Sequence, residues 1–142
     1  RYTRRIARAA ARGARYLAEA LNTENRYEQL VPAMEQAYAN RTVTAWVGGN
    51  DTEALLCQQF LRERGVSVPQ QVSVVGFDDT GEASFGGMTS YNFDIEAYVH
   101  AMVNFVLRPS SLPPSAHAQP ITFKGFVTPR RSSGPAPQHP RG

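Results

Sequence analysis

Two short polar motifs contain residue types that bind small polar molecules. Asn50 and Asp51 follow a short apolar run with β-branched residues, and Asp78 and Asp79 follow a second such run at residues 72–77. An Asn side chain both donates and accepts hydrogen bonds, whereas a carboxylate only accepts them. Such groups suit the adjacent hydroxyls of a sugar or the polar edge of a nucleobase. Aromatic side chains near these motifs could stack on such a ligand: Phe77, Phe85 and Phe93.

Simpler structural roles compete with ligand binding at two of these residues. Asp51 is a natural N-cap for a helix that follows it, and Asp79 could cap or turn the loop after its strand. Asn50 and Asp78 come directly after a buried strand or its turn. We therefore expect ligand contact at Asn50 and Asp78 before the other two.

The sequence contains no motif of the common enzyme classes. There is no Gly-x-Ser-x-Gly, phosphate-loop or Gly-x-Gly-x-x-Gly pattern. The three histidines lack metal-ligand spacing, and Cys57 lies among apolar residues, as a core or interface thiol does. A phospho-acceptor site at Asp78 and Asp79 would need a third acid and a nearby lysine, but Lys124, the only lysine, falls within a predicted strand. The sequence therefore predicts no catalytic residue, no metal and no cofactor.

Segments with helical or strand periodicity position the two polar motifs. Residues 42–77 alternate between buried strands and an amphipathic helix, and this β-α-β unit implies a parallel sheet covered by helices. Ligands of such sheets bind beyond the carboxyl ends of the strands, where both motifs fall. The expected helices span 3–21, 26–39, 52–64 and 94–107, the expected strands 42–47, 72–77 and 121–127, and the expected loops 80–90 and 109–120.

The composition is that of a soluble protein with one domain. The 142 residues are 42% hydrophobic and 19% charged, and no apolar run approaches the ~20 residues of a membrane span. The single cysteine excludes an internal disulfide and suits a reducing compartment, so we expect a cytoplasmic protein without a membrane partner. Six arginines and no acid lie in residues 1–16, which leaves a net charge of −3 on the remainder. Such a charged helix face is more typical of a solvated surface than of a DNA contact.

Four stretches of the sequence resemble one known family in their order and spacing. They are TAWVGGNDTEAL (44–55), RERGVSVPQQVSVVGFDDTGEAS (62–84), MTSYNFD (88–94) and RRSSGP (130–135). With them the chain resembles the effector-binding half of the lactose-repressor/galactose-repressor (LacI/GalR) family, a half that is also found fused to DNA-binding heads of the GntR type. The resemblance implies a type I periplasmic-binding-protein-like fold, with two α/β subdomains and a small effector between them. This chain would be mainly the C-terminal subdomain, a three-layer α/β sandwich with a parallel sheet.

The resemblance also implies roles for individual residues. Asn50 and Asp78 match positions that hydrogen-bond the effector, and Phe93 and Asp94 match positions of the hinge crossover that face the cleft. The helix after the first polar motif and the loop after the second match segments that build a homodimer. On this mapping the interface candidates are Ala54, Cys57, Leu61 and Phe85.

The resemblance further implies how the chain is divided and what it does. We expect residues 1–128 to be a partial effector-binding domain and residues 129–142 to be a flexible tail. The helix at 94–107 would belong to an N-terminal subdomain that is missing from a fragment of this kind. The predicted function is effector sensing and dimerisation in a LacI-type transcription regulator, with a sugar or a purine as effector and operator DNA bound only through a missing N-terminal head. A transport-type periplasmic sugar-binding protein of the same fold is the alternative.

Overall fold

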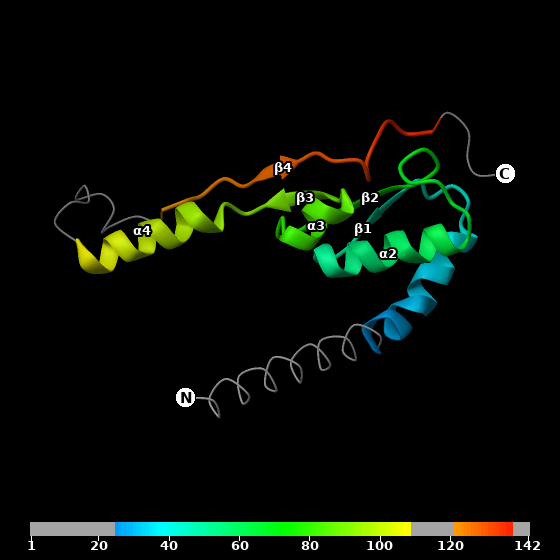
Figure 1. The fold of residues 1–142 in the computed structure, drawn as a ribbon, viewed down its shortest axis with the longest axis horizontal. Coiled ribbons are helices and arrows are strands. Elements are labelled where there is room, and N and C mark those ends of the chain that lie inside the picture. Colours follow the sequence, from blue (N-terminus) through cyan, green and yellow to red (C-terminus); the bar gives the residue numbers. More distant parts are fainter. Residues whose placement is uncertain (1–24, 109–120, 138–142) are drawn as a thin grey trace, which may run out of the picture. The chain divides into compact units, whose positions relative to one another are not determined.

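The computed structural model describes residues 25–108 and 121–137 (Figure 1). The chain divides into two compact units, residues 1–41 and residues 42–142, and each unit is described by itself. In the second unit the described residues form a sheet and the helices labelled α2, α3 and α4.

Within the described residues, the first unit consists of one helix and the turn after it. Residues 25–39 are helical, which confirms the helix predicted at 26–39. The helix predicted at 3–21, with its arginine-rich face, and the loop predicted at 109–120 lie outside the described residues.

A four-stranded sheet organises the second unit (Figure 1). Its strands follow one another in chain order: β1 (Ala45–Val47), β2 (Ser73–Phe77), β3 (Thr89–Asn92) and β4 (Phe126–Thr128). Strands β1, β2 and β3 are parallel, whereas β4 runs antiparallel to β3. This arrangement confirms the predicted α/β class and the β-α-β unit.

Helix α2 (Asp51–Glu63) packs on one face of the sheet. Trp46 of β1 and Phe60 of α2 are both buried there, with ring centroids 5.9 Å apart. Glycine at position 76 allows the close approach of α2 to β2, because a Cβ atom at Gly76 would collide with Asp51. The apolar face of α2 and the small residue in β2 thus together fix how the helix covers the sheet.

The start of α2 differs from the sequence prediction. Asn50, rather than Asp51, is the N-cap, since its backbone is extended and its side-chain oxygen accepts a hydrogen bond from the N–H of Glu53 at 2.9 Å. Asp51 is the first helical residue and is only 1% exposed. The predicted Asp51 cap is wrong because both residue types are good caps, and the helix begins one residue earlier than expected.

A short helix and a strand replace most of the loop predicted at 80–90. Helix α3 (Gly81–Gly86) begins where the hydroxyl of Thr80 accepts a hydrogen bond from the N–H of Ala83 at 3.2 Å, and it ends at Gly87, whose φ is 67°. Strand β3 follows and pairs with β2. The glycine and serine content favours a loop, but a threonine cap and a left-handed glycine bound a helix here.

Described residues that follow β4, within the segment predicted as a flexible tail, pack against the sheet. Strand β4 itself overlaps only the end of the strand predicted at 121–127. Ser132 is 0% exposed, and its hydroxyl donates to the carbonyl of Val74 at 2.6 Å and accepts from the N–H of Thr89 at 2.7 Å. The packed part of the second unit therefore extends beyond residue 128, the boundary that the sequence predicted.

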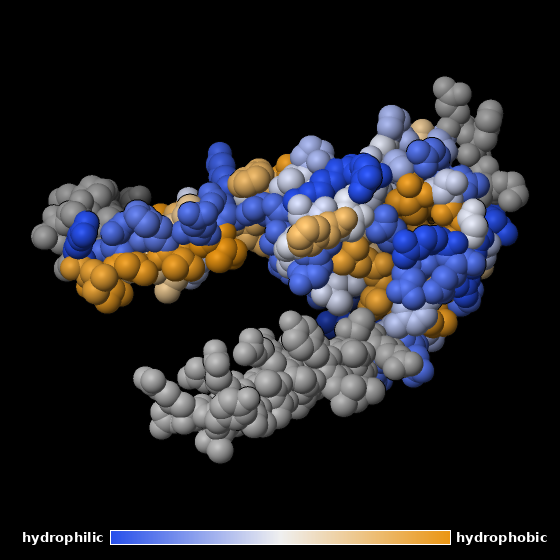
Figure 2. All heavy atoms as spheres, viewed as in Figure 1, coloured by the Kyte–Doolittle hydropathy of each residue, from blue (hydrophilic) through white to orange (hydrophobic). Residues whose placement is uncertain are grey.

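Helix α4 (Ile95–Leu107) confirms the helix predicted at 94–107, yet none of its residues is buried. Apolar side chains gather along it in the space-filling view (Figure 2). Across residues 25–108 and 121–137, no helix has the length and apolar content needed to cross a membrane. The large exposed apolar side chains of α4 are Ile95, Tyr98, Val99, Met102, Val103, Phe105, Val106 and Leu107.

Candidate functional site

The carboxyl ends of β1, β2 and β3 form one edge of the sheet, because the three strands are parallel neighbours. Asn50 follows β1, Asp78 follows β2, and Phe93 and Asp94 follow β3. The structure therefore brings all four residues of the predicted effector site to this edge, where ligands of parallel α/β sheets bind.

The side chain of Asn50 serves the helix cap with only one of its two polar atoms. Its oxygen accepts the hydrogen bond from the N–H of Glu53, whose carboxylate in turn accepts one from the N–H of Gly49 at 3.1 Å. This reciprocal contact resembles a capping box and holds the side chain in place. The amide nitrogen of Asn50 has no hydrogen-bond partner among the described residues, so it can donate to a ligand.

Asp78 is exposed and has a φ of 98°, a region that residues other than glycine rarely adopt. Its backbone N–H is held by the carbonyl of Tyr91 at 3.0 Å. In the part of the chain that the structure describes, the carboxylate of Asp78 contacts no protein donor. Strained backbone is common at functional sites, and this carboxylate is free to accept hydrogen bonds from a ligand.

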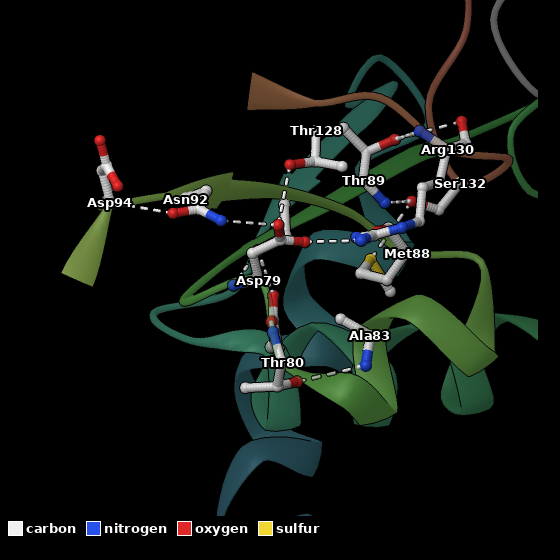
Figure 3. A network of polar contacts seen from close by, with 12 residues as sticks. Asp79, Thr80, Ala83, Met88, Thr89, Asn92, Asp94, Thr128, Arg130 and Ser132 are labelled. Carbon is white, nitrogen blue, oxygen red and sulfur yellow. Dashed lines mark hydrogen bonds and ion pairs between the residues drawn. The ribbon is translucent and has the colours of Figure 1, made fainter. Parts of the chain in front are cut away.

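Asp79 is the centre of a polar network (Figure 3). Its Oδ2 atom accepts hydrogen bonds from Asn92 Nδ2 and Thr128 Oγ1, each at 2.9 Å, and its Oδ1 atom lies 2.6 Å from Arg130 Nη2. Burial by itself would raise the pKa of Asp79, but these three hydrogen bonds and the Arg130 charge outweigh it and lower the pKa. Asp79 is therefore ionised and connects the end of β2 to Asn92, Thr128 and Arg130, a larger role than turning or capping a loop.

Asp51 joins three elements inside the second unit. Its Oδ1 atom accepts a hydrogen bond from the hydroxyl of Ser90 at 2.5 Å, and its Oδ2 atom accepts one from the N–H of Thr80 at 2.7 Å. The same Ser90 hydroxyl accepts the N–H of Asp79 at 3.0 Å. The start of α2, the end of β2 and strand β3 are thus held together directly behind the predicted ligand-binding edge.

Three aromatic rings cluster beside the same edge. The ring centroids of Phe77 and Phe93 are 6.0 Å apart, those of Phe77 and Tyr91 are 5.9 Å apart, and those of Tyr91 and Phe93 are 5.0 Å apart. Phe93 is 44% exposed and can offer part of its ring for stacking. Phe85, which the sequence grouped with these aromatics, lies on α3 and has no ring contact with them among the described residues.

Two of the four residues predicted for the dimer interface are buried within this chain. Ala54 and Leu61 are 0% exposed within this chain, so their side chains are not accessible to a second copy. Cys57 is half-buried and Phe85 is 92% exposed. The resemblance assigned all four residues to the interface, whereas the packing of α2 on the sheet buries two of them.

The described residues contain neither a reactive thiolate nor a cluster of metal-binding side chains. Burial, with a smaller effect of the nearby Glu53 charge, raises the pKa of the Cys57 thiol to about 11. The thiol is therefore protonated at neutral pH, which makes it a poor nucleophile. Within residues 25–108 and 121–137, no three His, Cys, Asp or Glu side chains group closely enough to hold a metal ion.

Four residues of the polar networks escaped the sequence prediction: Ser90, Asn92, Thr128 and Arg130. Arg130 belongs to the RRSSGP stretch that supported the resemblance, but no role followed from it. The contacts of Asn92 and Thr128 with Asp79 join positions 13 and 49 residues apart. Local spacing carries no signal for contacts of this range.

Known proteins similar to this chain are transcription regulators. Residues 1–133 match the family model described as periplasmic binding protein-like domain. The HTH-type transcriptional regulator AscG of Escherichia coli is 34% identical over 99 residues, which make up 66% of this chain and 28% of AscG. The chain thus spans less than a third of the length of this curated relative.

Solved structures agree with this assignment. A sugar-binding transcriptional regulator of the LacI family from Escherichia coli, in complex with phosphate, is 33% identical with a TM-score of 0.52, over 62% of this chain and 32% of that protein. The cellobiose complex of the transcriptional regulator CelR is 25% identical with a TM-score of 0.55, over 75% of this chain and 33% of CelR. The chain therefore belongs to the family of periplasmic binding protein-like domains, and the similar proteins named above are transcription regulators.

Proposed function

We propose that this chain is part of the effector-sensing and dimerisation domain of a LacI-type transcription regulator whose effector is a sugar. The observation that carries the proposal is the edge of the sheet, where the amide nitrogen of Asn50, the carboxylate of Asp78 and the ring of Phe93 are open to a ligand. The similarity to named transcription regulators supports this function over that of a transport protein.

The chemistry of the edge matches a sugar. Adjacent hydroxyls can donate two hydrogen bonds to one carboxylate, and charged acceptors such as Asp78 make the stronger kind of hydrogen bond. The amide nitrogen of Asn50 can donate to a ring or hydroxyl oxygen, while the exposed part of Phe93 can pack on the apolar face of a pyranose. A purine could also use these groups. One related regulator is described as sugar-binding and another is solved in complex with cellobiose, and both favour a sugar as the effector.

Dimerisation and DNA binding would involve other parts of the protein. A homodimer would use the surface near Cys57 and Phe85, the two interface candidates that this chain does not bury completely. Operator DNA would be bound by a head that precedes this chain, and effector binding would shift the dimer between states of different DNA affinity. Such a protein acts in the cytoplasm and catalyses no reaction.

The exposed face of α4 supports a second subdomain in the complete protein. Together with Ile121 and Phe123, α4 lines an apolar groove of about 300 Å³, in which the rings of Tyr98 and Phe123 meet edge to face at 5.7 Å. Exposure of such a continuous apolar surface to water is unfavourable, and a patch of this kind usually marks an interaction site. We expect the N-terminal subdomain of the complete regulator to bury this face.

Calorimetric titration of the full-length protein tests the effector proposal. We expect cellobiose, lactose or a related sugar to bind, and hypoxanthine and guanine not to bind. Asp78→Ala removes a charged hydrogen-bond acceptor worth about 1.5–3 kcal/mol, so affinity should fall by roughly 10-fold to 150-fold. Gln59→Ala, an exposed change in α2, is the matched control and should leave affinity unchanged. Binding of nucleobases alone, or full affinity in Asp78→Ala, would refute the proposed site.

A DNA mobility-shift assay separates the regulator from the transport alternative. The full-length protein should retard DNA from upstream of its own gene, and the sugar found by calorimetry should change that affinity at least fivefold. A protein that binds the sugar but no such DNA would instead support the transport-type function.

A further inference from the structure

The chain passes between the sheet and α4 at two neighbouring points. It leaves β3 after Asn92 and enters α4 through Asp94, and it returns to the sheet at β4, which begins with Phe126. These two crossings are paired, since Asn92 lies opposite Phe126 in the antiparallel ladder. Any movement of α4 relative to the sheet must therefore act through this pair of strands.

The carboxylate of Asp79 is hydrogen-bonded to both strands that lead to α4, β3 and β4 (Figure 3). A single oxygen, Oδ2, accepts the hydrogen bonds of Asn92 from β3 and of Thr128 from β4, while Arg130 pairs with Oδ1. The backbone N–H of Asp79 is fixed by the hydroxyl of Ser90. The end of β2 is thus tied to the two strands that lead to α4, through a carboxylate that is only 12% exposed.

The same connection continues to the start of α4. The side-chain oxygen of Asn92, whose amide nitrogen is bound to Asp79, accepts the N–H of Asp94 at 2.6 Å. Asp94 has a φ of 54° and caps α4 by accepting the N–H of Ala97 at 3.3 Å. Asn92 is therefore oriented at one end by Asp79 and at the other fixes the left-handed turn that contains the cap.

We propose that Asp79 is a positioning residue that sets the geometry of the crossing at Asn92, Phe93 and Asp94, and with it the first turn of α4. That this geometry also serves effector binding at Phe93 and Asp94 rests on the proposed function. A partly buried carboxylate with two hydrogen bonds and one ion pair resists reorientation, since each displaced partner would leave a polar group unpaired. Asp79 lies next to the open carboxylate of Asp78, so the positioning network begins one residue from a predicted ligand contact.

Amide hydrogen exchange, followed by NMR on the full chain without any ligand, tests the proposal. We expect Asp79→Ala to raise the exchange rates of the Asp94 and Ala97 amides at least tenfold, because the side chain of Asn92 is released. The amides of Leu56 and Phe60 in α2 should change less than threefold. Glu82→Ala is the matched control, since it removes a carboxylate from an exposed position of α3 three residues after Asp79, and both groups of amides should then stay within threefold.

Two further results decide whether the role is positional. Asn92→Ala keeps Asp79 and Arg130 but breaks the connection to Asp94, so it should reproduce the faster exchange at Asp94 and Ala97 even if Asp79→Ala fails to fold. Equal acceleration in α2 and at the crossing, or no acceleration at Asp94 in Asn92→Ala, would overturn the proposal. Because no sugar is present, these outcomes are independent of whether the effector proposal holds.

Discussion

The hydroxyl of Ser132 takes the place of a direct hydrogen bond between two strands of the sheet. Its removal should lower the free energy of unfolding. It accepts the N–H of Thr89 at the start of β3 and donates to the carbonyl of Val74 in β2. The backbone carbonyl of Ser132 also accepts the N–H of Val74 at 2.7 Å. One residue from beyond β4 thus completes the pairing of β2 with β3 at a point where the two strands do not bond directly.

The size of the effect follows from what Ser132→Ala leaves behind. The N–H of Thr89 would lose its partner in a site from which water is excluded, since Ser132 is 0% and Thr89 only 3% exposed. A buried polar group left unsatisfied costs about 1–3 kcal/mol, and the carbonyl of Val74 loses a hydrogen bond as well. Each of the two groups should cost about 1–2 kcal/mol, the lower part of this range. We therefore expect the free energy of unfolding to fall by about 2–4 kcal/mol in total.

Thermal and urea unfolding, each followed by circular dichroism, measure this change. A loss of 1 kcal/mol lowers the melting temperature of a domain of 60–100 residues by about 4–8 °C, so the variant should melt at least 8 °C lower. Ser84→Ala is the matched control because the same atom is removed from an exposed position of α3. A fall of less than about 0.5 kcal/mol in Ser132→Ala, the range of ordinary surface substitutions, would refute the role given to this hydroxyl.

Three further predictions concern the packing of α2 on the sheet, the reactivity of the Cys57 thiol and the stability of the protein at acid pH. Gly76→Ala should destabilise the protein by about 1–3 kcal/mol in urea unfolding, because the added methyl group meets Asp51. Iodoacetamide should label Cys57 with a rate that still rises about tenfold per pH unit between pH 8 and 10, since thiolate is the reactive form and the pKa is about 11; a plateau near pH 9 would contradict this. The lowered pKa of Asp79 stabilises the fold above its unfolded value of about 3.9, and this contribution is lost as the pH falls through the folded value. Urea unfolding between pH 2.5 and 6 should accordingly show a weaker acid dependence for Asp79→Asn than for the unaltered protein.

The sequence predicted the elements that have a strong periodic pattern. Strands β1 and β2 and helices α2 and α4 were expected within a few residues of their observed bounds, because β-branched runs and amphipathic spacing are local signals. Helix α3 and strand β3 were missed, since a six-residue helix has too few turns for a visible apolar period. Its bounds depend on Thr80 and Gly87, which the loop prediction counted as polar and flexible residues.

Within the candidate site, too, local sequence patterns did not predict the environment of single residues. Asp78 and Asp79 are adjacent carboxylates. The sequence preferred Asp78 as a ligand contact because of its position after the strand and because it matches an effector-binding position of the resembled family. In the structure their φ angles of 98° and 51° accompany opposite environments, with Asp78 in solvent and Asp79 directed into the network of Arg130. That difference depends on β4, whose residues pair with β3 from positions 34 to 38 residues away, and on the residues that follow β4. No local pattern could have predicted the contacts that Asp79 makes with Thr128 and Arg130.

The burial of Ala54 and Leu61 constrains how a dimer could form. A stable interface covers about 800 Å² on each partner, and the single exposed ring of Phe85 can contribute only about 1.5–3 kcal/mol when it is buried. Other residues must therefore join it, and Leu55 and Cys57 are the half-buried apolar residues of α2. Leu55 lies against Gly86 at the end of α3, so α2 and α3 present one joint surface beside Phe85. We propose that a homodimer of this protein would form across that joint surface and not along the face of α2 that contains Ala54 and Leu61, because the sheet already occupies that face.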